Sequence, residues 1–253
     1  WMCMKNPIHG PIKKMIKCIT FDLDDTLWAV NPVVDQANRT LLEWLQQNAA
    51  AFTQTHSLSD FPRLRREVLE RHPEIAHSVT QIRLKMLEHG LRLAGYADEE
   101  TETLTLQAFE VFYEARQQVT FFEHALAMLK NLHQNGYTLG ALSNGNANIH
   151  KVGLSELFDF QFSADQVGQE KPHPLMFEQM LHHVSLRPEQ VIHIGDNPAH
   201  DIEGANNVGL WSIWVNLEGK SDHVPATRTV TCLSDIPAAV AEIEALAKTR
   251  VTI

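Results

Sequence analysis

Apolar residues recur along the chain with two different spacings. Residues 16–23 form a short apolar, β-rich run that predicts a buried strand ending in acidic residues. From about residue 31 to 117 apolar positions recur at helical spacing, as Leu104, Ala108 and Phe112 do, and predict only helices. Further along, predicted strands alternate with predicted helices. The strands are 137–142, 158–162, 191–194 and 210–215, and the helices are 146–153, 174–184, 199–207 and 234–247.

This alternation predicts an α/β fold. Strands that are apolar throughout and separated by helices are typical of a parallel sheet covered on both faces. We therefore expect one α/β core formed by residues 14–30 and 118–253, with an all-helical insertion at 31–117 directly after the first strand.

Composition and charge narrow the possible partners. The 253 residues are 44% hydrophobic and 21% charged, which is ordinary for a globular protein. The net charge of −10 argues against sequence-independent binding of nucleic acid, although a metal ion and one lysine can still attract an anionic substrate. Apolar runs fall far short of the roughly 18 residues that a membrane span needs. We expect neither nucleic acid nor a membrane as partner.

Cysteine usage and the first residues bear on the compartment. Cys3, Cys18 and Cys232 are widely scattered, which excludes a disulfide framework or a zinc ribbon and fits a reducing environment. Residues 1–15 lack the apolar core and cleavage site of a secretory signal. The sequence predicts a cytoplasmic protein.

Polar residues that carry chemistry follow the predicted strands. Asp22 and Asp24 follow the first, Ser143 and Asn144 the second, and Asp196 to Asp201 the strand at 191, while Lys171 precedes the helix at 174. Turns favour Asp and Asn, so each loop alone has a structural explanation. Asp201 could be no more than a helix N-cap, and Lys171 could be a surface lysine. Because ligands bind at the carboxyl ends of parallel strands, the loops together predict a hard divalent metal such as Mg²⁺ beside a lysine.

These segments resemble the four motifs of the haloacid dehalogenase superfamily, in order and along essentially the whole chain. Asp22-x-Asp24-x-Thr26 resembles the first motif, Ser143 the second, Lys171 the third, and Gly195-Asp196 through Asp201 the fourth. Asp25 stands where glycine is commoner. The resemblance implies a Rossmann-like three-layer core with an all-helical cap inserted after the first strand.

The resemblance also implies roles. Asp22 would be the nucleophile that forms an aspartyl-phosphate, and Mg²⁺ would be held by Asp22, the backbone carbonyl of Asp24 and Asp196. Lys171, the Ser143 hydroxyl and the Asn144 backbone N–H would bind the transferring phosphoryl group. Asp201 would hold Lys171 or a metal-bound water.

Asp24 bears on the reaction class. An acid two residues after the nucleophile can protonate a leaving alkoxide and then activate water. Dehalogenases release halide, which needs no proton, and in that branch of the superfamily the corresponding residue is not an acid. Asp24 therefore favours phosphoryl transfer, while a phosphatase and a mutase remain open.

The cap segment 73–83 resembles that of bacterial phosphatases assigned to the riboflavin pathway, which act on 5-amino-6-(5-phospho-D-ribitylamino)uracil and on flavin mononucleotide (FMN). Trp28 could stack on a substrate ring or could pack the loop internally. His77 and Arg83 could contact polyol or carbonyl oxygens of the substrate. His193, in a predicted strand, is interpreted as a hydrogen-bonded core residue.

Other functions remain open at this point. A sugar-phosphate phosphatase or mutase would share the motifs, and a non-catalytic module could bind metal and phosphate without turnover. A dinucleotide-binding fold is set aside because Gly-x-Gly-x-x-Gly follows no predicted strand. We expect a monomer or a homodimer that acts on a small phosphorylated metabolite.

Overall fold

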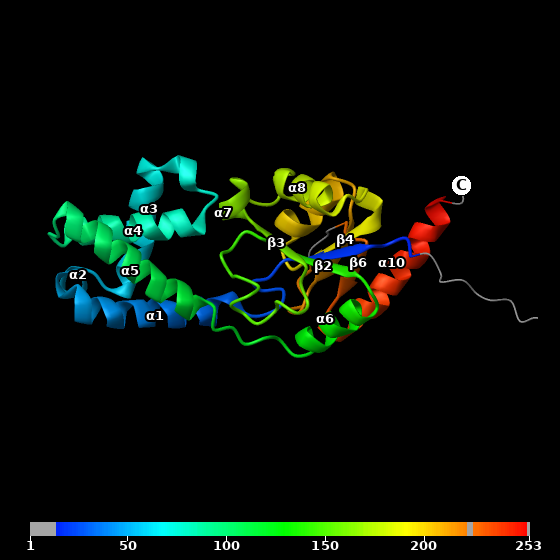
Figure 1. Cartoon of the computed structure of the whole chain (residues 1–253), viewed down its shortest axis with the longest axis horizontal. Helices are drawn as coiled ribbons and strands as arrows, with labels where there is room; N and C mark the ends of the chain where they lie inside the picture. The colour runs from blue at the N-terminus through cyan, green and yellow to red at the C-terminus, as the bar shows by residue number, and fades with distance from the viewer. Residues whose placement is uncertain (1–13, 222–224, 252–253) are drawn as a thin grey trace, which may run out of the picture.

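A computed structural model describes residues 14–221 and 225–251 (Figure 1). Its central feature is a six-stranded sheet in which every pair of neighbours is parallel. The strand order is β3-β2-β1-β4-β5-β6. The first strand of the sequence therefore lies between β2, which ends at Ser143, and β4, which ends just before Asp196. The strands are β1 Cys18–Phe21, β2 Thr138–Ser143, β3 Phe160–Ser163, β4 Val191–Gly195, β5 Trp211–Val215 and β6 Arg228–Val230.

Helices cover both faces of this sheet. Helices α6 (Ala125–Gln134) and α10 (Ile236–Val251) share one hydrophobic cluster with the sheet, whereas α8 (Leu175–Val184) and α9 (Gly204–Asn207) share another. Short α7 (Ala164–Val167) follows β3. The predicted three-layer α/β fold is confirmed. Burial of both sheet faces explains why β1, β4 and β5 are apolar throughout rather than alternating.

The chain between β1 and α6 is helical. It contains α1 Val30–Asn48, α2 Ala50–Thr55, α3 Phe61–Arg71, α4 Val79–Leu93 and α5 Asp98–Arg116. These helices lie at the left of Figure 1 and bury a hydrophobic cluster of their own, with Leu41, Phe52, Leu87 and Ala108 among its members. The two separate clusters support a cap at 31–117 and a core at 14–30 and 118–253, a division that stays a prediction.

Three elements differ from expectation. Residues 146–148 are irregular and 149–153 form turns rather than a helix, because Asn148 Oδ1 accepts hydrogen bonds from two following backbone N–H groups and Gly153 has φ +83°. Strand β6 was not predicted, since an Arg-Thr-Val edge strand lacks an apolar run. Helix α6 was not predicted either, although its buried side chains do recur at helical spacing.

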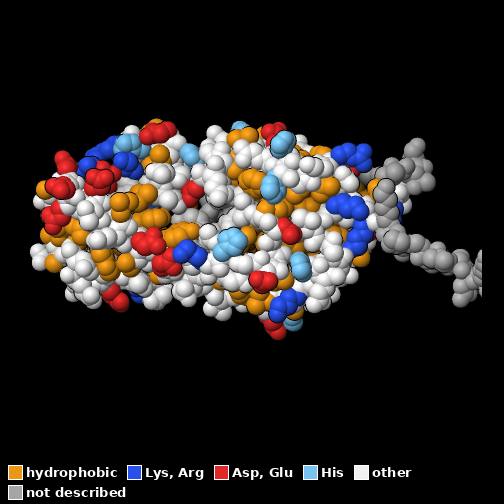
Figure 2. All heavy atoms as spheres, in the orientation of Figure 1, with side chains coloured by type: hydrophobic (Ala, Val, Ile, Leu, Met, Phe, Trp, Pro, Cys, Tyr) orange, Lys and Arg blue, Asp and Glu red, His pale blue; other side chains and the backbone are white. Residues whose placement is uncertain are grey.

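Some expectations concern residues that the structure treats only in part. Cys3 and residues 1–13 of the segment examined for a secretory signal lie outside the described residues. Within the described ranges, no helix combines the length and apolarity that crossing a membrane takes. On the face drawn in Figure 2 acidic and basic side chains are intermixed. Cytoplasmic location and oligomeric state stay predictions.

Candidate active site

Three strand ends bring the motif residues together. The backbone N–H of Asp22 donates to Ile194 O at 2.8 Å and so extends the pairing of β1 with β4 by one residue. Ser143 ends β2 on the other side of β1, and Asp196 follows the end of β4. Because all three strands are parallel, their carboxyl ends meet, and the three side chains line one pocket of about 160 Å³.

The chain curls tightly after Asp22. Asp25 adopts a left-handed conformation with φ +62°, which explains why glycine is commoner at this position. Its N–H donates to Trp28 O at 2.7 Å, and its Oδ1 accepts from the N–H of Val30, the first residue of α1. Asp25 therefore both closes the loop and satisfies a free donor at the start of the first cap helix.

Lys171 lies at the bottom of this pocket and is 1% exposed. Its Nζ donates to Asp22 Oδ1 at 2.8 Å, to Asp201 Oδ1 at 2.6 Å and to Leu142 O at 2.6 Å. Burial by itself would lower the pKa of Lys171, but the charges of Asp201 and Asp22 outweigh burial and raise it. The ammonium group is thus held in its charged form beside Asp22.

The side chain of Asn144 fixes the backbone of Lys171. Asn144 Oδ1 accepts from Lys171 N at 2.7 Å, and its Nδ2 donates to Lys171 O at 2.9 Å. The sequence predicted only that the Asn144 backbone would bind phosphate oxygens, and that contact stays a prediction. The observed pair of hydrogen bonds adds a second task, which is to place Lys171 against the end of β2.

Asp22, Asp196 and Asp201 each offer a carboxylate oxygen within 4.8 Å of the others. Burial, followed by the charges of Asp201 and Asp196, raises the pKa of Asp22 well above its ordinary value, although Lys171 opposes the shift. Burial and Asp201 raise the pKa of Asp196 to about 6. The site is therefore a place where negative charge is crowded and poorly solvated.

Thr26 links two of these carboxylates. Its Oγ1 lies 3.3 Å from Asp22 Oδ2 and 3.1 Å from Asp196 Oδ1, and it also accepts from Asp196 N at 3.1 Å. Its place in the first motif predicts no role for Thr26. In the structure its hydroxyl group links the loop after β1 to the end of β4 through these hydrogen bonds.

Asp201 is fully engaged by protein donors. Oδ1 accepts from Lys171, and Oδ2 accepts from Asn197 N at 3.0 Å. A Cβ at Gly195 would lie 2.2 Å from Asp201 Cγ, so only glycine admits this close approach. Although burial opposes ionisation, Lys171 and then His193 lower the pKa of Asp201 below its ordinary value. Asp201 is thus an anion that holds Lys171 in place.

His193 completes this buried chain. It is 0% exposed, and its ring nitrogens lie 2.8 Å from Thr20 Oγ1 and 3.2 Å from Asp201 Oδ1. Burial lowers the pKa of His193, which favours the neutral ring. The interpretation of His193 as a hydrogen-bonded core residue is confirmed, and the structure adds that it connects the sheet interior to Asp201.

The donor set fits a divalent hard cation. Asp22 and Asp196 supply carboxylate oxygens, and their raised pKa values mark negative charge that a cation would compensate. Asp201 accepts from Lys171 and Asn197 and is more deeply buried than Asp22 or Asp196, so Asp22 and Asp196 are the better candidates for ligands. A part for the Asp24 backbone carbonyl stays a prediction.

The side chain of Asp24 turns away from the carboxylate cluster. Its Oδ1 accepts from Trp28 Nε1 at 2.8 Å, and its Oδ2 accepts from Arg116 Nη2 at 2.5 Å. Asp24 lines both the small pocket that holds Asp22 and a larger cavity between the cap helices. It therefore borders both spaces.

Trp28 is not available to a substrate. Its side chain is 0% exposed and packs edge-to-face on Phe121, with ring centroids 5.5 Å apart, while its indole N–H is used by Asp24. The expectation of stacking on a substrate ring is therefore wrong, and the alternative of internal packing is observed. Its large apolar ring is removed from water, and its single donor is satisfied.

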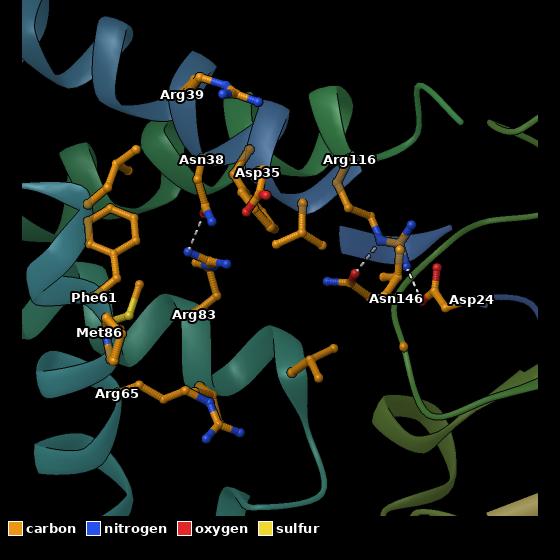
Figure 3. Close-up of a pocket in the computed structure, with 18 residues that line it drawn as sticks. Asp24, Asp35, Asn38, Arg39, Phe61, Arg65, Arg83, Met86, Arg116 and Asn146 are labelled. Carbon is orange, nitrogen blue, oxygen red and sulfur yellow. Dashed lines mark hydrogen bonds and ion pairs between the residues drawn. The ribbon is translucent and has the colours of Figure 1, made fainter. Parts of the chain in front are cut away.

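The larger cavity, the cap cavity, has a volume of about 600 Å³ and lies mainly between α1, α3, α4 and α5 (Figure 3). Arg83 lines it, donates to Asn38 Oδ1 at 2.9 Å and lies 3.9 Å from the centroid of the Phe112 ring. Within the described part of the chain, His77 is half-buried and is not among the residues that line this cavity. The geometry supports a substrate contact for Arg83 and gives none for His77.

Two of the lining residues that sequence reasoning missed are Arg116 and Gly145. Arg116 is the last residue of α5 and lies 92 positions from Asp24 in the sequence. Helical spacing marks the buried face of α5, but it does not show which acid an arginine on that face will meet. The two residues become neighbours only through the fold.

Comparison with known proteins decides the family. The model of the haloacid dehalogenase-like hydrolases matches residues 16–209. The chain belongs to this family. The expectation of an enzyme from the haloacid dehalogenase superfamily is confirmed.

Relatives within the family have different activities. The chain is 31% identical over 203 residues to the 5-amino-6-(5-phospho-D-ribitylamino)uracil phosphatase YigB of Escherichia coli K12, covering 80% of this chain and 84% of that protein. It is 27% identical to a glyceraldehyde 3-phosphate phosphatase of Methanothermobacter thermautotrophicus, covering 88% and 97%. A crystal structure of a 2-haloacid dehalogenase from Pseudomonas syringae pv. tomato DC3000 is 33% identical, with a TM-score of 0.84 over 90% of this chain and 99% of that one.

Proposed function

We propose that this hydrolase is a Mg²⁺-dependent phosphatase that cleaves phosphate monoesters of small metabolites through an aspartyl-phosphate on Asp22. The observation that carries the proposal is the position of Asp24. Its side chain borders both the pocket of Asp22, Ser143 and Lys171 and the cap cavity. A phosphoryl group in the small pocket would have its ester oxygen on the side of Asp24, where a departing alkoxide needs a proton.

The residues support a two-step displacement. A carboxylate oxygen of Asp22 attacks phosphorus, the bond to the ester oxygen breaks, and Asp24 gives its proton to the departing alkoxide. Asp24 then takes a proton from water, which attacks phosphorus and releases inorganic phosphate from Asp22. Lys171 and the Ser143 hydroxyl would stabilise the transferring oxygens. Bound Mg²⁺, held by Asp22 and Asp196, would neutralise charge on the phosphoryl group.

The cap cavity favours a leaving group larger than a triose. Its volume of about 600 Å³ lies in the range of sites for drug-sized ligands. Its walls combine apolar side chains, among them Phe61, Met86 and Phe112, with the guanidinium of Arg83. A flat heterocycle joined to a polyol matches both kinds of wall. We therefore propose 5-amino-6-(5-phospho-D-ribitylamino)uracil and FMN as substrates, which the likeness to the Escherichia coli phosphatase supports.

A 2-haloacid dehalogenase is the second candidate, because a solved structure of that name is 33% identical to this chain. Halide departs without a proton, so dehalogenation gives no task to Asp24. Asp24 therefore favours the phosphatase.

One substrate panel separates these functions. The purified protein is incubated with FMN, the ribitylaminouracil phosphate, glyceraldehyde 3-phosphate, glucose 1-phosphate with a bisphosphate primer, and 2-chloropropionate, each with and without Mg²⁺. Phosphate release that requires Mg²⁺ and is most efficient for the two ribityl esters is expected, and Asp22→Asn serves as the inactive control. Chloride release from 2-chloropropionate without phosphate release from any ester would overturn the proposal.

A further inference from the structure

Arg116 is a buried arginine with an incomplete set of partners. It is 2% exposed at the end of α5, where the chain returns from the cap helices to the sheet. Nη2 donates to Asp24 Oδ2 at 2.5 Å, and Nε donates to Asn146 Oδ1 at 2.8 Å. Figure 3 draws both contacts and shows the guanidinium beside Asp24 and Asn146. Nη1 is buried and has no hydrogen-bond partner among residues 14–221 and 225–251.

An unpaired buried donor on a charged group is unfavourable, so its partner is to be sought in the neighbouring space. Arg116 lines the cap cavity beside Asp24, which also lines the catalytic pocket. Nη1 itself is covered by protein atoms, so an incoming oxygen has to displace them slightly. A charge-assisted hydrogen bond to that oxygen would offset the shift.

The surroundings of Arg116 hold Asp24 in one place. A Cβ at Gly145 would lie 2.4 Å from Asp24 Oδ2 and 3.2 Å from Arg116 Nη2, so the pair packs directly on the glycine. Asn146, which binds Arg116 Nε, also donates to Thr80 Oγ1 at 3.1 Å at the start of α4. The position of Asp24 is thus tied to both sides of the cap cavity.

We propose that Arg116 positions Asp24 through Nη2 and binds, through Nη1, a hydroxyl oxygen on the carbon next to the ester carbon of the leaving group. This inference rests on the proposed phosphatase function. In the proposed reaction Asp24 faces the ester oxygen, and Arg116 is hydrogen-bonded to Asp24. The guanidinium therefore lies one hydrogen-bond length further along the leaving group, and an ester oxygen and a vicinal hydroxyl oxygen are separated by a similar distance. Arg116 therefore selects phosphate esters of vicinal diols and polyols over simple alkyl esters.

The test uses two substrates that differ by this hydroxyl group, glycerol 3-phosphate and 3-hydroxypropyl phosphate. Wild-type kcat/KM should favour glycerol 3-phosphate by about 10- to 100-fold, the range of one charge-assisted hydrogen bond. In Arg116→Gln this preference should fall to about threefold or less, because the neutral amide offers the hydroxyl oxygen only a hydrogen bond that is no longer charge-assisted. Arg116→Lys keeps one cationic donor for Asp24, so it should recover kcat on 3-hydroxypropyl phosphate while the preference stays lost.

Two further variants make the result decisive. Arg92→Gln changes an arginine of α4 that is half-exposed and paired with Glu88, and it should keep the wild-type preference. Gly145→Ala introduces a methyl group against Asp24 Oδ2 and should lower kcat on both esters, which tests the positioning role even where Arg116→Gln does not fold.

The outcomes separate the two proposals. An active wild type that shows no preference, or a preference that survives in Arg116→Gln and Arg116→Lys, overturns the role of Arg116 and leaves the phosphatase intact. A wild type that hydrolyses neither these two esters nor any other phosphate ester overturns the proposed function, and the inference with it.

Discussion

Lys171 and Asp22 form a buried ion pair, with Nζ 2.8 Å from Oδ1 and the lysine 1% exposed. The same ammonium group binds Asp201 at 2.6 Å, so one cation serves two buried anions. Removing the lysine would leave two carboxylates without their cation in the interior, which is much less favourable than the loss of a surface pair, whereas neutralising Asp22 leaves Lys171 paired with Asp201.

Lys171→Gln should therefore destabilise the fold as well as abolish turnover. We expect a loss of about 3–5 kcal/mol in the free energy of unfolding, measured by urea denaturation without metal. Lys85→Gln is the matched control, because Lys85 forms a surface pair with Glu88 and its removal should change stability by about 1 kcal/mol or less. Equal losses in the two variants would contradict the buried pair.

Asp22→Asn should remove activity without unfolding the chain. Burial and neighbouring acids raise the pKa of Asp22, so its ionised form is unfavourable, and a neutral amide relieves part of that repulsion. We expect kcat to fall by about 10³-fold or more while the thermal midpoint stays the same or rises. Substantial Mg²⁺-dependent hydrolysis by this variant would refute the assignment of the nucleophile.

Asp24→Asn should slow the hydrolysis of each substrate by a factor that grows with the basicity of its leaving group. Alkyl phosphates release a strongly basic alkoxide, so kcat on them should fall by about 10²–10⁴-fold. p-Nitrophenyl phosphate releases a weakly basic phenolate and should lose far less. Rates measured with both substrates check the acid role, which equal losses on the two would contradict.

Metal-free stability should depend on pH through Asp196. Its pKa is about 6 in the folded protein, above the ordinary value of 3.8, so the folded state binds the proton more tightly than the unfolded state. This contribution to stability is present at low pH and is lost as the pH rises through about 6. Thermal midpoints of the metal-free protein should therefore fall from about pH 4 to about pH 6 and change little through this group above about pH 7.

Mg²⁺ should act in the opposite direction, because ligand carboxylates have to be ionised. Added Mg²⁺ should raise the thermal midpoint above pH 6 and have little effect near pH 5. Asp196→Asn should lose both the pH-dependent fall and the stabilisation by Mg²⁺. A wild-type response to Mg²⁺ that is the same at both pH values would exclude this account.

Arg83→Gln should change substrate recognition rather than the chemical step. Burial and then Arg65 lower the pKa of Arg83 to about 10, so the guanidinium still carries its charge at neutral pH. The variant removes a charged donor from the wall of the cavity and should raise KM for FMN by about tenfold, with a smaller effect on kcat. Steady-state kinetics check this, with Arg92→Gln as control, and a fall in kcat alone would be the contrary result.

Sequence reasoning was strongest where a residue acts at a strand end. An apolar run fixes a buried strand, parallel strands bring their carboxyl ends together, and the order of the loops then predicts that Asp22, Ser143, Lys171 and Asp196 share a pocket, as they do. It was weakest for Trp28 and for residues 146–153. In both cases the local pattern admits two structures, and hydrogen bonds to Asp24 or Asn148 select one of them.

The sequence by itself determined the three-layer α/β core, the helical nature of the insertion and the set of groups at the rim of the sheet. Tertiary structure alone decided that Arg116 meets Asp24, that Thr26 joins Asp22 to Asp196, and that His193 supports Asp201. The reason is physical. Periodicity and turn chemistry act over a few residues, whereas the partner of a buried charge is chosen by the packing of segments far apart in the chain.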